Sequence, residues 1–387
     1  MAINNRPTDT DSQLLMPLNL PHRFLISFIL CIPVFLINFG GNYLGWDQYI
    51  SLENAYWAQM VLSLVIVWGC GSFLFSRALK SIFTLRLNMF TLVGLAAALL
   101  WFYSFFGLLR PEMFPPSFHQ TETLVPVYFD AASYVVMFVI LGQYLEMKAR
   151  LQITTELFRC IGKIYPSEQA DRIRSFIKNA LANQLPLARQ INGFTHWFVL
   201  LVLIAAGISF AIWNYKGPQP SALYGFITAL SVMLAASPCA LTLAAPVSLL
   251  IGLKRAATQG FIINNPDLIE TLHRHHNVKD LITAGAIVTL KHQPPETLSQ
   301  AGIILTDKVE NAECTLPVLA DKIMYNIYKN FAFALAYNIL VLPVAAGIFY
   351  PFTGFLLGPV TASIAMSVSS LIVILNALRL RETTAED

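Results

Sequence analysis

A proline and a cysteine stand side by side within a long apolar stretch, in the run ASPCAL at 236–241. Pro238 has no backbone N–H and its ring clashes one turn back, so the carbonyl of Leu234 loses its helical partner. Inside a membrane, such a break is tolerated only where it lies against protein or lines a polar cavity. The thiol of Cys239 beside it is a soft ligand of the kind that selects copper(I) or another thiophilic metal. The run predicts an ion site at a helix break; the alternative is an ordinary proline kink with a buried cysteine.

The composition identifies the class of protein to which these residues belong. Hydrophobic residues make up 56% of the chain and charged residues only 12%, and the hydrophobic residues come in long blocks. A bilayer-spanning helix needs about 20 such residues. We therefore predict an all-α, polytopic membrane protein with about eight spans, at 24–44, 57–76, 87–108, 126–147, 194–214, 222–250, 328–349 and 352–377.

The distribution of Lys and Arg between these spans predicts the orientation. Only Arg110 and Lys216 fall on one side, and the rest of the 25 Lys and Arg residues fall on the other. Short cytoplasmic loops carry the excess of positive charge. Both termini are therefore predicted to be cytoplasmic, in a bacterial inner membrane or, for an exported protein, a host membrane. The expected parts are a tail at 1–23, four spans in 24–147, a loop at 148–193, two spans in 194–250, a loop at 251–327, two spans in 328–377 and a tail at 378–387.

Cysteine usage and net charge exclude other classes. The five cysteines are scattered and form no CxxC pair, so a disulfide framework is not expected. The formal net charge of +3 is explained by the Lys and Arg residues that set the orientation in the membrane, and the sequence contains no basic patch typical of nucleic-acid binding. The group His273, His275 and His276 is interpreted as a charged, solvated loop end, with a metal cluster as the alternative.

Several short motifs occur in the order found in one known family. They are NMFTL at 88–92, VYFDAA at 127–132, LGQYLE at 141–146, the SPCAL run leading to GFIINN at 260–265, Tyr337-Asn338, Met366 with Ser369 and Ser370, and NALR at 376–379. In this order they resemble the heavy-metal P-type ATPases, and within them the copper(I)-exporting branch. The resemblance covers the membrane part almost end to end and implies that architecture here.

The resemblance also implies a set of ion ligands. Three basic residues, Lys254, Lys329 and Arg379, mark the cytoplasmic ends of these spans. Counted from them, Cys239, Asn338 and Met366 lie 15, 9 and 13 residues into their helices. At a rise of about 1.5 Å per residue this is roughly 14–22 Å, near the middle of a hydrocarbon core of about 30 Å. Tyr337 and Asn338 could instead be interhelical hydrogen-bond partners, and Met366 a packing residue. The implied metal ligands are Cys239, Tyr337, Asn338, Met366 and Ser370, with Met89 and Asp130 as candidates for the ion entrance or path.

The two loops lack the motifs that P-type pumps use for phosphoryl transfer. The sequence contains no TGE, no DKTGT and no GDGxND. Where the family has DKTGT, this chain has DLITAGA at 280–286, so alignment from Gly260 places Asp280 near the phosphorylated position, while alignment on Gly285 places Ile282 there. The loops at 148–193 and 251–327 have about 46 and 77 residues, whereas globular domains most often have about 100–150. They are too short for the actuator, phosphorylation and nucleotide-binding domains of the family. The sequence therefore predicts a pseudo-ATPase that is not an enzyme and needs neither ATP nor magnesium.

Two departures from the family bear on function. Ser237 replaces one cysteine of the copper branch's CPC, which leaves the metal identity open, and Arg189 replaces an aspartate expected near the start of the fifth span. We predict a membrane protein that binds, and could passively conduct, copper(I) or a related heavy metal without ATP hydrolysis. The alternative is a catalytically dead regulatory or scaffolding paralogue that transports nothing. Expected partners are membrane lipid and a membrane protein or a second copy of the chain, and no nucleic acid.

Overall fold

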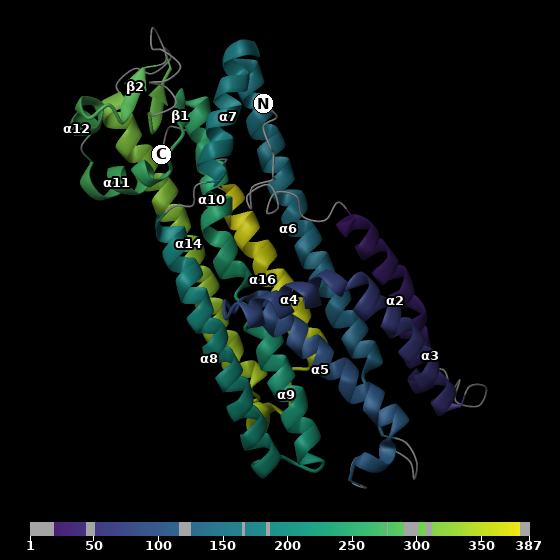
Figure 1. The fold of residues 1–387 in the computed structure, drawn as a ribbon. Helices are drawn as coiled ribbons and strands as arrows, with labels where there is room; N and C mark the ends of the chain where they lie inside the picture. The colour runs from purple at the N-terminus through teal and green to yellow at the C-terminus, as the bar shows by residue number, and fades with distance from the viewer. Residues whose placement is uncertain are drawn as a thin grey trace.

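The computed structural model describes residues 19–43, 51–115, 125–164, 167–182, 186–276, 278–289, 301–306 and 312–379. These residues form an elongated bundle of long helices with a small mixed α/β part at one end (Figure 1). We call this end of the molecule the sheet end. The bundle helices are α2 (Leu20–Tyr43), α3 (Leu52–Leu64), α4 (Ser72–Phe83), α5 (Met89–Leu109), α6 (Phe129–Ile164), α8 (Pro186–Lys216), α9 (Ser221–Ala235), α10 (Cys239–Thr258), α14 (Ala312–Ala345) and α16 (Pro359–Arg379).

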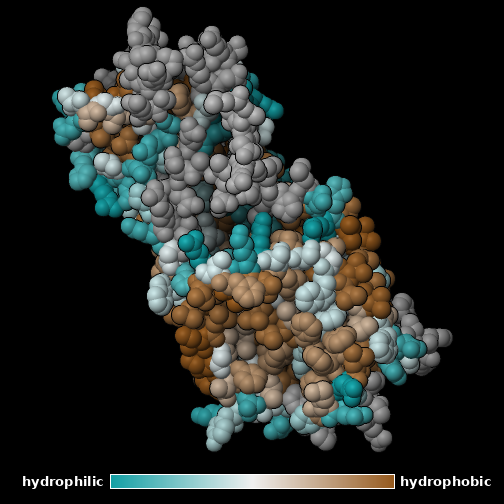
Figure 2. Space-filling view, viewed as in Figure 1, coloured by the Kyte–Doolittle hydropathy of each residue, from teal (hydrophilic) through white to brown (hydrophobic). Residues whose placement is uncertain are grey.

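The helices confirm the prediction of an all-α polytopic membrane protein. Six of the described helical segments are long and apolar enough to cross a bilayer, or seven if one bent pair is counted as a span. On the face shown in Figure 2, a hydrophobic band covers the bundle and hydrophilic residues lie at both of its ends. The remaining predicted span, 126–147, falls in α6, which runs on to Ile164 and carries the polar residues Asp130, Gln143 and Glu146.

The second predicted span, 57–76, is not one straight helix. It consists of α3, a π-helical turn η2 (Val65–Cys70) and α4, and the chain bends by 59° between Cys70 and Ser72. Gly71 sits at the bend, where an added Cβ would lie 2.3 Å from the backbone oxygen of Val67. Hydropathy cannot predict this bend because both arms are apolar. We call α3, η2 and α4 together the bent span.

α10 lies at the centre of the bundle. Fifteen of its 20 residues are buried, and it packs against α6, α14 and α16. A buried polar network joins three of these helices: the Ser248 hydroxyl donates to Asn326 Oδ1 at 2.7 Å, and Asn330 Nδ2 donates to Ser248 at 2.9 Å. The Asn376 amide of α16 donates to Asn330. Hydrogen bonds of this kind between apolar helices fix their register.

The loop predicted at 251–327 contains a small sheet that was not predicted. Its strands are β1 (Phe261–Ile263), β2 (Ile287–Thr289) and β3 (Ile303–Leu305), in the order β1-β3-β2. β3 pairs antiparallel with β1 and parallel with β2. The two short helices α11 (Asp267–His275) and α12 (Val278–Thr283) complete this part, and a third helix α7 (Ser167–Ala182) packs on β1 and α6. The β-branched, buried strand residues explain the local preference for extended chain.

The close approach of α10 and α14 gives a stability prediction. An added Cβ at Gly252 would lie 2.7 Å from Cγ1 and 2.8 Å from Cδ1 of Ile323. We expect Gly252→Ala to lower the free energy of unfolding by about 1–3 kcal/mol through overpacking, measured by thermal unfolding in detergent. Gly207→Ala is the matched control, because an added Cβ there meets nothing within 4 Å. Combining Gly252→Ala with Ile323→Ala should cost less than the sum of the single changes; strict additivity would contradict the contact.

Candidate metal site in the membrane helices

The helix is interrupted where Pro238 predicts. α9 ends at Ala235 and α10 begins at Cys239, and the connecting residues include Ser237, which is 1% exposed. The break lies within the protein, so no opened backbone faces lipid. The Cys239 side chain follows the break directly and is itself buried.

Cys239 lies among polar groups from two other helices. Its sulfur is 3.9 Å from Glu146 Oε2 and 3.9 Å from Gln143 Nε2, both on α6. The hydroxyl of Ser370 on α16 also interacts with the thiol. The thiol therefore sits at a junction of α6, α10 and α16, with a carboxylate that can accept its proton.

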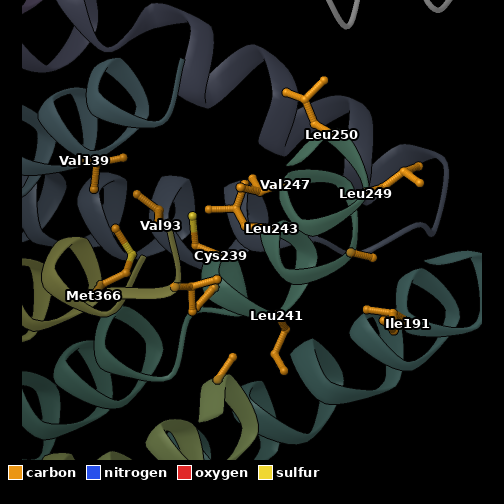
Figure 3. Close-up of a cluster of buried hydrophobic side chains, with 14 of the residues drawn as sticks. Val93, Val139, Ile191, Cys239, Leu241, Leu243, Val247, Leu249, Leu250 and Met366 are labelled. Atoms are coloured by element: carbon orange, nitrogen blue, oxygen red, sulfur yellow. The ribbon is translucent and has the colours of Figure 1, made fainter. Parts of the chain in front are cut away.

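Met366 comes from α16, one turn before Ser370. Its side chain is buried, and its carbonyl accepts a hydrogen bond from the Ser370 hydroxyl at 3.3 Å. Figure 3 shows Met366 in the same cluster as Cys239, with Val93 of α5 and Val139 of α6 beside them. The cluster thus contains two sulfur atoms, a thiol and a thioether, from two helices that pack against each other.

Tyr337 and Asn338 lie on α14. The Asn338 side chain donates to Ala334 of its own helix at 2.8 Å, so this bond does not link helices. The Tyr337 hydroxyl approaches Ser369 of α16 but makes no hydrogen bond of good geometry within the described residues. The Asn338 bond therefore does not link helices, whereas the Tyr337 hydroxyl faces the neighbouring helix α16 at Ser369.

Four buried polar atoms in this region have no hydrogen-bond partner among the residues described. They are Gln143 Oε1, Ser237 Oγ, Tyr337 OH and Asn338 Oδ1. A buried polar atom left unpaired costs about 1–3 kcal/mol, and such atoms are rare in native proteins. All four are oxygens that can face a cation. Gln143 contacts the Cys239 thiol and Ser237 lies two residues before it, so the unpaired oxygens of these two residues fit a site that is completed by a positively charged ion.

Glu146 is the residue that the sequence reasoning did not assign to the site. It is almost fully buried and pairs with Arg150 at 2.9 Å, one turn further along α6. Arg77 of α4 is a second positive charge within electrostatic reach. The available signal was a carboxylate in the LGQYLE motif within an apolar segment, which is a functional candidate by default.

The two candidates for an ion path lie elsewhere. Asp130 is in the first turn of α6, 16 residues before Glu146, which is about 24 Å along the helix, and it accepts a hydrogen bond from Asn38 at 2.5 Å. Met89 is the first residue of α5, where Asn88 forms a capping box with Thr91. Arg189 lies in α8, and its side chain is outside the described part.

The region of the degenerate phosphorylation motif is at the sheet end. Asp280 is exposed and lies inside the short helix α12. Gly285 follows in the turn before β2, with φ of +70°, a conformation that favours glycine.

The histidines near this region are held by one carboxylate. His273 Nδ1 lies 2.6 Å from Asp321 Oδ1, and His276 Nε2 lies 2.9 Å from Asp321 Oδ2. Within the described ranges no group of three or more His, Cys, Asp or Glu side chains is arranged to hold a metal. The histidines therefore link α11 and the residue that follows it to α14.

Comparison with known proteins identifies relatives. No family model matches the chain. It is 30% identical over 358 residues to a copper-exporting P-type ATPase of Legionella pneumophila subsp. pneumophila, over 69% of this chain and 48% of that protein. It is 25% identical to a silver exporting P-type ATPase of Salmonella typhimurium, over 66% of this chain and 42% of that protein. It is 22% identical to copper-transporting ATPase 2 of Rhizobium meliloti, over 70% of this chain and 42% of that protein.

The chain spans less than half the length of these relatives. The matched share of the chain and the apolar helices agree with the family that the sequence motifs predicted. The chain is therefore a relative of the copper-type heavy-metal P-type ATPases, consistent with a membrane-domain portion of such a pump.

Proposed function

We propose that this copper-pump-like membrane protein binds copper(I), or a related soft ion, between α6, α10, α14 and α16, and lets it pass without ATP hydrolysis. The observation that carries the proposal is the buried Cys239 thiol, 3.9 Å from the Glu146 carboxylate and 3.9 Å from the amide of Gln143, whose oxygen has no hydrogen-bond partner among the described residues. The names of the relatives support the choice of ion, because they include copper and silver exporters.

The ligand chemistry favours a soft ion. Thiolate and thioether sulfur select copper(I), whereas magnesium prefers oxygen ligands in octahedral geometry. Cys239 would supply the thiolate, and Met366 the thioether. Tyr337, Asn338 and Ser370 would supply weaker oxygen contacts around them. Ser237 replaces a second thiolate, so this site has one fewer strong ligand than CPC would give.

Glu146 has a role that follows from its position. When the ion binds, the Cys239 thiol loses its proton and a sulfur–copper bond forms. The Glu146 carboxylate lies beside the sulfur and can take that proton. The resulting thiolate–copper(I) pair is neutral, which lowers the cost of holding the ion at this depth. Arg150 would then lose its charged partner and turn toward water.

Passage without ATP is supported by the loops. The stretch 251–327 has three short strands and two short helices in its described part, and the sequence there contains neither DKTGT nor GDGxND. Phosphoryl transfer needs an acceptor, a positioned lysine and a magnesium site. We therefore propose a pseudo-ATPase, oriented with the sheet end in the cytoplasm as the Lys and Arg distribution predicts.

One observation favours the second candidate function, a regulatory or scaffolding paralogue. Glu146 is already paired with Arg150 at 2.9 Å, and Arg77 lies nearby. Two positive charges beside the carboxylate oppose the arrival of a cation. A scaffold would retain the membrane helices for their surface and would bind a membrane-protein partner with no ion in the site.

Removal of the thiol distinguishes the two functions. We expect Cys239→Ala to weaken copper(I) binding at this site at least tenfold, equivalent to about 1.4 kcal/mol, in competition titrations of detergent-purified protein under reducing conditions. Cys314→Ala is the matched control, because Cys314 is exposed at the start of α14. Equal affinities together with an equal number of bound ions in all three proteins would favour the scaffold.

The proposed role of Glu146 gives a separate prediction. Glu146→Gln removes the proton acceptor and leaves two arginines uncompensated, so copper(I) affinity should fall at least tenfold, about 1.4 kcal/mol. Glu156→Gln is the control, since Glu156 is also on α6 but pairs with Lys254 at 2.5 Å. The same competition titration measures both. A Glu146→Gln protein that binds as tightly as the unchanged chain would refute this role.

Transport is tested with purified protein in liposomes that contain a copper(I) indicator. We expect influx down a concentration gradient in the absence of ATP, with no increase when ATP and magnesium are added, because no phosphoryl acceptor is available. Cys239→Ala should abolish the influx. Flux that appears only with ATP would contradict the passive mechanism, and no flux with binding intact would restrict the function to binding.

A further inference from the structure

A second pair of buried thiols lies away from the site described above. Cys31 is on α2 and Cys70 is the last residue of η2, and both are buried and free of disulfides. We propose that Cys31 and Cys70 together form a second binding site for a soft monovalent ion such as copper(I), where α2 packs on the bent span. The inference extends the proposed function to a second location and uses none of the residues of the first.

The orientation of Cys31 follows from the pattern along α2. Arg23, Ser27 and Cys31 are spaced by four residues, so they lie on one face of the helix. Ser27 and Val34, on either side of Cys31 along this face, are 0% exposed, whereas Ile32 and Phe35 are about half exposed. The Cys31 thiol therefore points into the protein and away from lipid.

Arg23 fixes this face of α2 against the turn that carries Cys70. Its Nη1 donates to the Cys70 carbonyl at 2.9 Å, to the Ser72 hydroxyl at 2.8 Å and more weakly to the Gly69 carbonyl at 3.4 Å. α2 and η2 pack directly on each other. Cys31 and Cys70 are both buried and come from these two packed elements, so we place the two sulfurs at the interface between α2 and η2.

The π-helical turn provides an unusual support for one ligand. π-helical turns are rare, and those that occur are frequently at functional sites. Here the turn ends at Cys70 and is followed by Gly71 at the bend between η2 and α4. The distortion presents the carbonyls of Gly69 and Cys70 to Arg23, which keeps a positive charge beside the Cys70 thiol.

The charges and protons of this site balance. Copper(I) would form one bond to each sulfur, and each thiol would release its proton to water, which gives a bis-thiolate complex with one net negative charge. The guanidinium of Arg23 supplies the compensating positive charge. Two thiolates are a soft ligand set that favours copper(I) or silver(I) over zinc, which takes four ligands.

The test uses the full chain carrying Cys239→Ala, in detergent and under reducing conditions, with copper(I) as the probe. We expect this protein to retain one tightly bound copper(I), and addition of Cys31→Ser or Cys70→Ser to weaken that binding at least tenfold. Addition of Cys314→Ser should change nothing. If Cys239→Ala alone removes all tight binding, or if both serine changes leave the remaining binding intact, the second site does not exist.

A second measurement on the unchanged chain covers the case of variants that fail to fold. Copper(I) should protect both Cys31 and Cys70 from a small membrane-permeant alkylating reagent, read by peptide mass spectrometry. Protection of Cys239 without Cys31 and Cys70 overturns the second site and leaves the proposed function standing. Protection of Cys31 and Cys70 without Cys239 supports the second site and overturns the proposed binding at Cys239.

Discussion

The interrupted helix between α9 and α10 is the constraint on which the rest of the membrane structure depends. A proline break inside a bilayer leaves backbone groups without helical partners, and these groups must be surrounded by protein. The bundle meets this requirement by enclosing α10 almost completely, with α6, α14 and α16 packed around it. Gly252 allows α14 to come close, and the Ser248–Asn326–Asn330 network fixes its register.

Because the break is enclosed by other helices, polar and ionisable side chains of those helices lie close to it. Cys239 begins α10, so its thiol lies directly after the break, beside Glu146 of α6 and Ser370 of α16. Arg150 pairs with the buried Glu146 at 2.9 Å and Arg77 is a second positive charge nearby, which offsets part of the cost of burying a carboxylate. In the function proposed above, an incoming cation would have to form ligand bonds that offset the loss of this pairing.

The sequence predicted the class of fold and the break, because both depend on local properties. Long apolar blocks specify membrane helices, and Pro238 removes a helical hydrogen bond within one. The outcome at a proline also depends on its surroundings, because Pro33, Pro246 and Pro343 lie inside helices that continue past them. The bend at Gly71 was missed, because it depends on a close contact with Val67 and leaves hydropathy unchanged. Glu146 was recognised only as part of a motif and was not assigned to the site. Its contact with Cys239 connects residues that are 93 positions apart in the sequence, which the sequence alone does not show. The unpaired oxygens of Gln143 and Asn338 depend on tertiary packing and have no signal in the sequence.

X-ray absorption spectroscopy of the copper(I)-loaded protein tests the central claim most directly. The Cys31→Ser, Cys70→Ser chain isolates the site at the break, so its spectrum reports the atoms bound to one ion. The account predicts copper(I) with sulfur neighbours, and a loss of sulfur scattering when Met366→Ala is added to this chain. A bound ion surrounded by nitrogen and oxygen alone, or a spectrum unchanged by Met366→Ala and by Cys239→Ala, would contradict it.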